Sequence, residues 1–308
     1  MISVPKTGRA ADGVLDALEA EAIWAIREAV AGFNRPVILY SIGKDSTVLL
    51  HLAAKAFQPS PIPLPVLHID TTWKFREMID FREKTAARLQ LDLRVHTNPA
   101  GLAAGVNPFD HGSDEYTRIM KTMALRQALD EGGYDIALGG ARRDEERSRA
   151  KERMFSLRGP GHVWDPSGQR PEFWTTVNTV LTPGQTMRAF PLSNWTELDV
   201  WRYIRRENLD VVPLYFTDER PTVLRQGKPV VVDDERFIFE PGEKAVMRRV
   251  RFRTLGCYPL SAAEESEALT VDDIIAELAT STTSERAGRL IDGEGASSME
   301  RKKLEGYF

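Results

Sequence analysis

The chain has 308 residues and a nearly balanced charge, with 41 Lys and Arg against 45 Asp and Glu. A net charge of −4 gives no overall field that would attract nucleic acid, and the length fits one large domain or one domain with an extension. No stretch reaches the length of a membrane span, and the first residues lack the apolar core of a signal peptide. We therefore expect a cytoplasmic protein that binds neither membranes nor nucleic acid. The single cysteine, Cys257, excludes an internal disulfide and a multi-cysteine cluster.

Strands and helices are expected to alternate through the first half of the chain. After a frayed tail at 1–13, an apolar stripe at helical spacing ends near Gly32. Strands are then predicted at 37–40, 64–69, 91–96 and 134–138, helices at 46–57, 74–90 and 113–131, and a loop at 97–112. This alternation predicts an α/β fold, a parallel twisted sheet with flanking helices and right-handed crossovers.

The pattern changes beyond residue 150. A polar loop or lid is expected at 154–187, followed by a strand at 189–192. A capping box at Thr196–Asp199 opens a helix, and a second is expected at Thr282–Glu285. Short strands with a turn at Gln226-Gly227 are expected in 222–253, and a helix at 270–278. We interpret the chain as an α/β domain over 14–210 and a C-terminal extension over 211–308.

A buried strand leads directly into a polar loop, Ser41–Ser46, and then into a helix. Backbone N–H groups and the helix dipole at such a turn suit a phosphate or pyrophosphate. The common P-loop is excluded because Ile38 stands where its first Gly should be and Asp45 follows the Lys. The loop is predicted to bind a phosphate or pyrophosphate group; the alternative is an ordinary capped helix start. Its binding residues would be Ser41, Gly43, Lys44, Asp45 and Ser46.

Two further polar segments follow predicted parallel strands, where ligands bind in such folds. Asp70 could ligate Mg²⁺ or hold the nucleotide, and could equally cap a helix. Arg142 and Arg143 form a forked cation pair suited to phosphate or sulfate oxygens. Asp144 could orient an Arg or bind metal; the alternative for this segment is a salt-bridged helix start.

Residues nearer the C-terminus give weaker indications of a functional site. Arg253 could reach the same anion, whereas Cys257 is more typical of a buried packing residue than of a nucleophile. The five histidines show no metal-ligand spacing.

The loop resembles the pyrophosphate loop of the ATP pyrophosphatase superfamily, S-G-G-x-D-S, from which Ile42 departs. Together the motifs resemble the small catalytic subunit of bacterial sulfate adenylyltransferase (ATP sulfurylase), over nearly the whole chain. The segments that carry this resemblance are Ser41–Ser46, His68–Phe75, Gly139–Arg153, Pro191–Trp201 and Arg251–Cys257.

The resemblance implies an adenine nucleotide alpha hydrolase-like (PAPS reductase-like) fold and a nucleotidyltransferase of sulfate assimilation and cysteine biosynthesis. ATP and sulfate would give adenylyl sulfate and pyrophosphate, with Mg²⁺ and a large GTPase subunit that binds GTP. Catalysis would fall to Lys44, Arg142, Arg143 and Asp144, and sulfate binding to Arg142, Arg143 or Arg253.

Three other functions are weighed against this one. A reductase of adenylylated sulfate would use a redox thiol in the C-terminal tail, and no thiol follows Cys257. A tRNA-modifying adenylase would need an RNA-binding module or basic face, which the sequence does not show. A nucleotide-sensing subunit that regulates a GTPase stays open. The sequence contains no GTPase motif, so GTP hydrolysis would require another polypeptide, with 154–187 and the stretch after Thr282 as expected contact surfaces.

Overall fold

The computed structural model describes residues 8–145, 147–172, 176–280 and 285. Its central sheet has six strands in the order β3-β2-β1-β4-β6-β5. The pairs are parallel except that β5 runs antiparallel to β6. The predicted α/β fold is confirmed, with one antiparallel strand at the edge. The strands are β1 (Pro36–Leu39), β2 (Val66–Ile69), β3 (Leu93–His96), β4 (Ile136–Leu138), β5 (Phe155–Arg158) and β6 (Thr186–Ala189).

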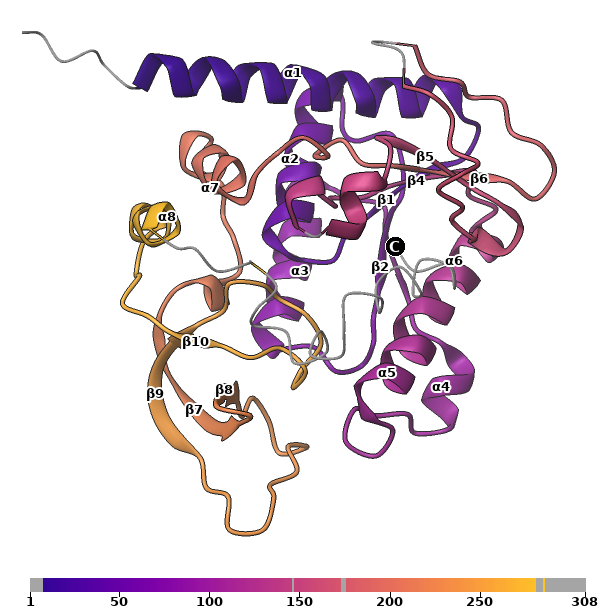
Figure 1. The fold of residues 1–308 in the computed structure, drawn as a ribbon. Helices are drawn as coiled ribbons and strands as arrows, with labels where there is room; N and C mark the ends of the chain where they lie inside the picture. The colour runs from indigo at the N-terminus through magenta and orange to yellow at the C-terminus, as the bar shows by residue number, and fades with distance from the viewer. Residues whose placement is uncertain (1–7, 146, 173–175, 281–284, 286–308) are drawn as a thin grey trace, which may run out of the picture.

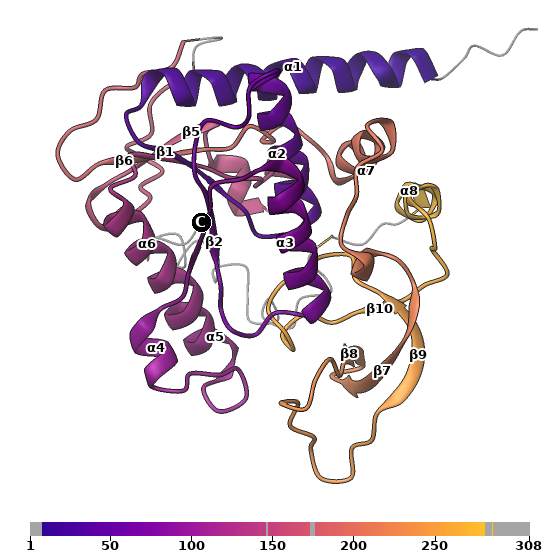
Figure 2. The same ribbon diagram turned by 180° about the vertical axis from the view of Figure 1, so that it is seen from behind.

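Helices cover both faces of this sheet. Figures 1 and 2 show α2 and α3 on one side of it, α4 to α6 on the other, and α1 across one end. Val37 packs in a cluster with Leu125 and Leu129 of α6, whereas the next residue, Ile38, packs in the larger cluster that contains residues of α1 and α2. This alternation buries both faces of β1, as is typical of a parallel sheet. The α-helices are α1 (Gly8–Gly32), α2 (Lys44–Phe57), α3 (Arg76–Leu89), α4 (Pro99–Ala103), α5 (Gly112–Thr117), α6 (Ala124–Gly132), α7 (Glu197–Arg206) and α8 (Val271–Thr280).

The strand order creates a switch point between β1 and β4. From β1 the chain moves outward to β2 and β3, and then returns to the other side of β1 as β4. The loops that leave β1 and β4 therefore diverge to opposite sides and leave a crevice at the carboxyl ends of these strands. Ser41–Ser46 and Gly139–Asp144 are the two segments that follow these strands.

A second, antiparallel sheet has the order β10-β9-β7-β8 and lies to one side of the central sheet (Figure 1). Its hairpin turns at Gln226 and Gly227, whose φ angles of +50° and +73° confirm the predicted turn. The strands are β7 (Asp218–Arg225), β8 (Lys228–Val231), β9 (Val246–Arg251) and β10 (Glu264–Glu265).

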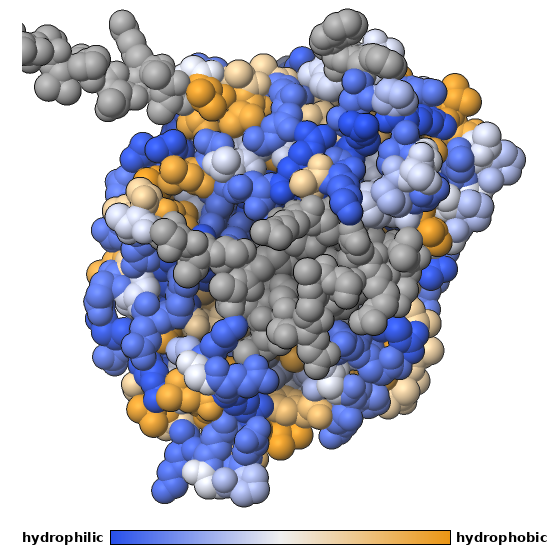
Figure 3. Space-filling view, in the orientation of Figure 1, coloured by the Kyte–Doolittle hydropathy of each residue, from blue (hydrophilic) through white to orange (hydrophobic). Residues whose placement is uncertain are grey.

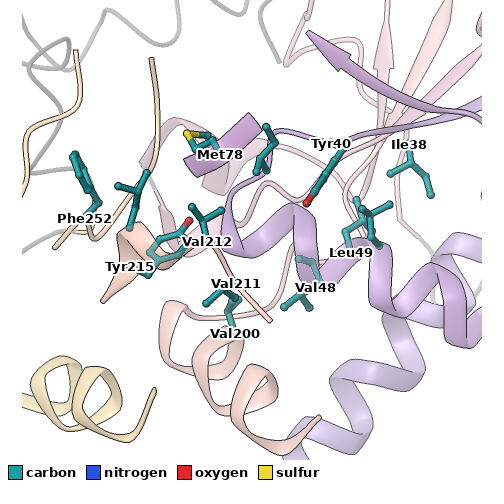
Figure 4. Close-up of a cluster of buried hydrophobic side chains, with 14 of the residues drawn as sticks. Ile38, Tyr40, Val48, Leu49, Met78, Val200, Val211, Val212, Tyr215 and Phe252 are labelled. Atoms are coloured by element: carbon teal, nitrogen blue, oxygen red, sulfur yellow. The ribbon is translucent and has the colours of Figure 1, made fainter. Parts of the chain in front are cut away.

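One hydrophobic cluster joins the two sheets. Figure 4 shows side chains from Ile38 and Tyr40 through Val48 of α2 to Tyr215 and Phe252, and all belong to the same buried cluster. Residues from both sides of position 210 therefore share a core. The division at 210/211 stays a prediction.

Two segments predicted as loops contain regular structure. Residues 97–112 include α4, because Asn98 accepts hydrogen bonds from the Ala100 and Gly101 N–H groups and Pro99 occupies the first turn. Residues 154–187 include β5 and the start of β6, and Trp164 within them is buried. Pairing with β6 accounts for the missed strand, because β5 has only four residues and buries its polar ones, Ser156 and Arg158, rather than Phe155 and Leu157.

Other boundaries also differ from expectation. α1 begins at Gly8, so the frayed tail predicted over 1–13 is wrong for residues 8–13. The strand expected at 189–192 ends at Ala189 instead. The predicted helix at 113–131 consists of α5 and α6 joined by a π-helical segment, η1 (Arg118–Met123). Short 3₁₀ helices occur elsewhere: η2 (Arg143–Glu145), η3 (Arg147–Lys151), η4 (Pro160–His162) and η5 (Pro213–Tyr215).

Both helices expected in the second half are present. At α7 the Thr196 hydroxyl accepts from the Asp199 N–H at 3.1 Å and the Asp199 carboxylate accepts from the Thr196 N–H at 3.0 Å, which confirms the first capping box. The second expected capping box lies outside the described residues except for Glu285.

The surface facing the viewer in Figure 3 is mostly hydrophilic, with hydrophobic side chains scattered among polar ones. Within the described ranges, no helix combines the length and the apolar character needed to cross a membrane.

Candidate active site

The loop after β1 closes on itself through its hydroxyl groups. The Ser41 hydroxyl donates to the Ser46 hydroxyl at 3.1 Å, and the Ser46 hydroxyl donates to the Gly43 carbonyl at 3.0 Å. Gly43 is the N-cap of α2, so Lys44 forms the first turn of the helix, two residues earlier than predicted. The N-terminus of α2 is therefore part of the loop, as an anion-binding turn requires.

The structure shows why the loop has Ile42 where the pattern S-G-G-x-D-S has glycine. Its φ angle is +71°, in the region that favours glycine, and its side chain is fully buried in the large hydrophobic cluster. A β-branched residue in this conformation stores strain of about 1–3 kcal/mol. Burial of the isoleucine side chain offsets that strain, because a glycine here would leave the side-chain volume empty.

Gly140, in the segment after β4, makes the closest backbone approach to this loop. A Cβ atom at Gly140 would lie 3.0 Å from both the Asp45 carbonyl carbon and the Ser46 nitrogen. By contrast, a Cβ at Gly43 would meet only ordinary contacts, at 3.5 Å from the Tyr215 hydroxyl. The position that fixes the two loops against each other is thus Gly140.

Four buried or partly buried charges form the centre of the site. Lys44 and Arg142 are each about 1% exposed. The Arg142 Nε donates to Asp45 at 2.6 Å, and the Lys44 ammonium lies 3.3 Å from the same carboxylate. Both cations also contact the carboxylate of Glu285, which comes from the far end of the chain. Two cations and two carboxylates therefore neutralise each other inside the crevice.

Burial and charge pairing act in opposite directions on these groups. Burial alone would lower the pKa of Lys44, but Asp45 and Glu285 outweigh it and the pKa is raised. Burial would raise the pKa of Asp45, but Arg142 and Lys44 outweigh it and the pKa is lowered. The pKa of Arg142 is likewise raised, by Asp45 and Glu285 against burial. Lys44 and Arg142 thus stay positive at neutral pH.

The crevice beside this cluster has an apolar end and a cationic end. Its apolar wall comes from strand residues Leu39, Leu67 and Ile69 and from Leu125 of α6, which suits an aromatic base. Beyond the loop, its charged lining residues are Lys74, Lys121, Glu145, Arg149 and Glu285. Apolar side chains next to buried cations are the arrangement that a nucleotide requires.

Sequence analysis missed two residues that complete the loop. The Tyr215 hydroxyl accepts from the Lys44 backbone N–H at 2.8 Å and so caps α2 from 171 positions away. The sequence suggests only a capping-box role for Glu285, whereas in the structure its carboxylate contacts Lys44 and Arg142. Only long-range folding brings either side chain here, and no local signal points to them.

Of the remaining predicted site residues, Arg143 and Asp144 lie beside the loop without lining the crevice. The Arg143 guanidinium donates to the Glu152 carbonyl and the Asn194 side chain and borders a separate hollow. Asp144 is more than half exposed, lies 3.7 Å from Arg142 and accepts from the Glu197 N–H at the start of α7.

Arg253 and Asp70 also have protein partners. Arg253 pairs with Glu197 at 2.7 Å. Asp70 accepts from the Thr72 N–H at 2.7 Å, across a turn in which Thr72 has a φ of +65°. The structure therefore brings Ser41, Gly43, Lys44, Asp45, Ser46 and Arg142 together, and places Asp70, Arg143, Asp144 and Arg253 around them.

The described residues contain no group of three or more His, Cys, Asp or Glu side chains that could hold a metal ion. Mg²⁺ needs only one or two carboxylates when nucleotide phosphates and water supply its other ligands. Asp45 and Glu145 both line the crevice, so the site offers carboxylates of the kind that would ligate a Mg²⁺ ion bound to a nucleotide.

Comparison with known proteins agrees with this geometry. Residues 35–263 match the phosphoadenosine phosphosulfate reductase domain, a class of α/β proteins. The matched range contains the loop after β1, the segment after β4 and strands β7 to β9 of the second sheet. One solved structure, phosphoadenylyl-sulfate (PAPS) reductase from Candida auris in a phosphate complex, is 18% identical with a TM-score of 0.48. The match covers 77% of this chain and 100% of the reductase chain.

Two relatives with high sequence identity identify the family within this class of α/β proteins. "Sulfate adenylyltransferase subunit 2" of Azospirillum brasilense is 63% identical over 94% of this chain and 97% of that protein. The protein of the same name from Rhizobium sp. (strain BR816) is 62% identical over the same shares. The chain belongs to the sulfate adenylyltransferase subunit 2 family, as its motifs predict.

We predict that Gly140→Ala lowers the affinity for ATP and the turnover by about tenfold to a hundredfold, because the new methyl group displaces the Ser41–Ser46 loop. Steady-state kinetics and a thermal melt would measure this. Gly159→Ala is the control, because its Cβ would meet only the Val163 carbonyl, at 3.8 Å. Equal kinetics for both variants would contradict the contact assigned to Gly140.

Proposed function

We propose that this chain transfers the adenylyl group of ATP to sulfate, giving adenylyl sulfate and pyrophosphate, in sulfate activation. The observation that carries this proposal is the buried pair of cations beside the crevice, Lys44 of the Ser41–Ser46 loop and Arg142 of the segment after β4. Membership of the sulfate adenylyltransferase subunit 2 family supports the choice of substrates. A cytoplasmic location stays our prediction.

The proposed chemistry is electrostatic. A sulfate oxygen attacks the α-phosphorus in line, the bond from the α-phosphorus to the bridging oxygen of the β-phosphate breaks, and pyrophosphate leaves toward the loop. Lys44 and Arg142 stabilise the negative charge that grows on the leaving group. Mg²⁺ bound with ATP would neutralise phosphate charge. No general base is required because sulfate is fully deprotonated at neutral pH.

Sulfate must be held against the repulsion of the phosphates. In-line attack places sulfate on the side of the α-phosphorus opposite to pyrophosphate, so Arg142, which stabilises the leaving group beside Asp45 and Glu285, does not also hold sulfate in this proposal. We assign the binding of sulfate to Arg149, Lys74 and Lys121, which line the same crevice. Arg143 and Arg253, the other candidates, act in this proposal by positioning the segments around Arg142, since each is paired with protein groups.

The proposal is tested by incubating the chain with ATP, Mg²⁺ and sulfate and assaying pyrophosphate. We expect Lys44→Ala to lower turnover by about a hundredfold or more, since it removes a buried cation from the leaving-group site. Lys55→Ala is the control: it lies on the same helix but pairs with Glu19 and Glu207 outside the crevice.

The melting temperature of both variants must be compared, because Lys44 is buried and its loss removes one of the two cations that pair with Asp45 and Glu285. A folded Lys44→Ala variant that retains wild-type turnover at saturating ATP would refute the loop assignment.

The competing reductase function depends on Cys257. The matched domain is named for a reductase, and although burial acts to raise the pKa of Cys257, Lys74 and Lys121 outweigh it and the pKa is lowered. However, the thiol is only 4% exposed, contacts the Thr71 hydroxyl at 3.3 Å and does not line the crevice. These features favour a packing role.

We therefore expect Cys257→Ser to retain adenylyl transfer within about twofold, since the proposed reaction uses no thiolate. Pyrophosphate release by wild type and variant, at matched folded fractions, is the measurement. Loss of turnover in a folded Cys257→Ser variant that still binds ATP would favour the reductase-like alternative.

We further propose that a large GTPase subunit drives the reaction. The name "subunit 2" of the relatives supports a heteromer. Within 154–187, Val163 and Val180 are exposed and offer apolar contacts, whereas the stretch after Thr282 lies outside the described residues apart from Glu285. Coupling requires the GTPase cycle to change the affinity of the crevice for substrates or products.

To test this, the chain is purified alone and with a co-expressed GTPase, and GTP is titrated. We expect adenylyl sulfate formation to rise with GTP only when the partner is present, because the mixed anhydride lies uphill from ATP. Equal product yields from the isolated chain, insensitive to both additions, would contradict the coupling.

A further inference from the structure

The carboxylate of Glu285 lies against both buried cations of the candidate active site. One of its oxygens contacts the Lys44 ammonium and the other contacts the Arg142 guanidinium. Its side chain is about 7% exposed, and it lines the crevice together with the loop. A carboxylate that bridges two cations with two oxygens presents the same charge pattern as two oxygens of a phosphate group.

The charges show why this position cannot be shared. Lys44 and Arg142 carry two positive charges, and Asp45 and Glu285 carry two negative ones. Glu145 and Glu197 lie nearby, but they pair with Arg149 and Arg253. With Glu285 in place the centre has no surplus positive charge, so it offers an entering pyrophosphate no net attraction. With Glu285 withdrawn, the Lys44–Asp45–Arg142 group regains a net positive charge.

Glu285 is also a costly partner for these cations. Burial raises its pKa against the opposing influence of Lys44 and Arg142, which shows that desolvation works against the charged form. A buried ion pair contributes little net stability for the same reason. A polyanion that offers more oxygens and more charge can therefore replace it.

From these contacts we infer that Glu285 is an intramolecular competitor for the pyrophosphate position: its carboxylate neutralises Lys44 and Arg142 in the unliganded chain and must leave before the β- and γ-phosphates can bind. This inference rests on the proposed function of the loop. It makes Glu285 a residue that sets the affinity for polyphosphate through competition, without taking part in the reaction.

The expected effect follows from the fraction of molecules in which the site is open. If Glu285 fills the position nine-tenths of the time, the apparent affinity for a phosphate ligand is reduced tenfold. Glu285→Gln keeps the shape of the side chain and removes its charge, so we expect pyrophosphate to bind about tenfold tighter or more. Glu267→Gln is the matched control: Glu267 is exposed and pairs with Arg249 at 2.6 Å on the surface.

The experiment is calorimetric titration of inorganic pyrophosphate into wild type, Glu285→Gln and Glu267→Gln in a chloride buffer without sulfate. Tighter binding by Glu285→Gln alone supports the inference. Unchanged or weaker binding by folded Glu285→Gln overturns it and leaves the loop assignment intact. Absence of pyrophosphate binding in all three proteins overturns both the inference and the proposed function of the loop.

A second measurement uses the wild-type chain and does not depend on the variant folding. Hydrogen exchange is followed in the peptide that contains Glu285, with and without pyrophosphate. Displacement predicts faster exchange in that peptide when pyrophosphate is bound. Slower exchange would mean that Glu285 stays and contacts the ligand, and it would overturn the competition.

Discussion

The site depends on how two buried cations are neutralised. Lys44 and Arg142 come from segments almost a hundred positions apart, and an isolated charge in either place would cost several kcal/mol in desolvation. Asp45, within the loop, neutralises one of these two positive charges, and Glu285 neutralises the other. In our proposal Asp45 stays with these cations, and Glu285 gives up its place to the polyphosphate. The ion pairs that neutralise the unliganded site would then also oppose the entry of the ligand.

Sheet topology makes this pairing possible. Because β1 and β4 are neighbours at a switch point, the loops after them open onto one crevice, and Gly140 allows their backbones to touch. Tyr215 then fixes the first N–H of α2 from beyond the central sheet, and the shared hydrophobic cluster holds Tyr215 in place (Figure 4). The second sheet therefore influences the site indirectly, because it shares the hydrophobic cluster that holds Tyr215.

Ile42 shows a compromise between backbone and core. The turn needs a positive φ, which glycine supplies freely, while the core beneath it has room for a large apolar side chain. The chain satisfies the core and accepts the strain. The loop consequently differs from the usual S-G-G-x-D-S pattern at Ile42, whose side chain packs in the hydrophobic core, whereas Ser41, Gly43, Asp45 and Ser46 match the pattern.

The sequence by itself determined the alternating strands and helices, the loop at Ser41–Ser46, the capping box at Thr196 and the family, because these depend on local periodicity, turn chemistry and contiguous motifs. It did not determine β5 or α4, whose weak patterns are outweighed by pairing with β6 and by the cap at Asn98. Nor could it separate Arg142 from Arg143, since adjacent residues share a motif but point to different surroundings. Tyr215 and Glu285 were decided only by the tertiary structure, because a hydrogen bond or ion pair across 171 or 241 positions leaves no local trace in the sequence.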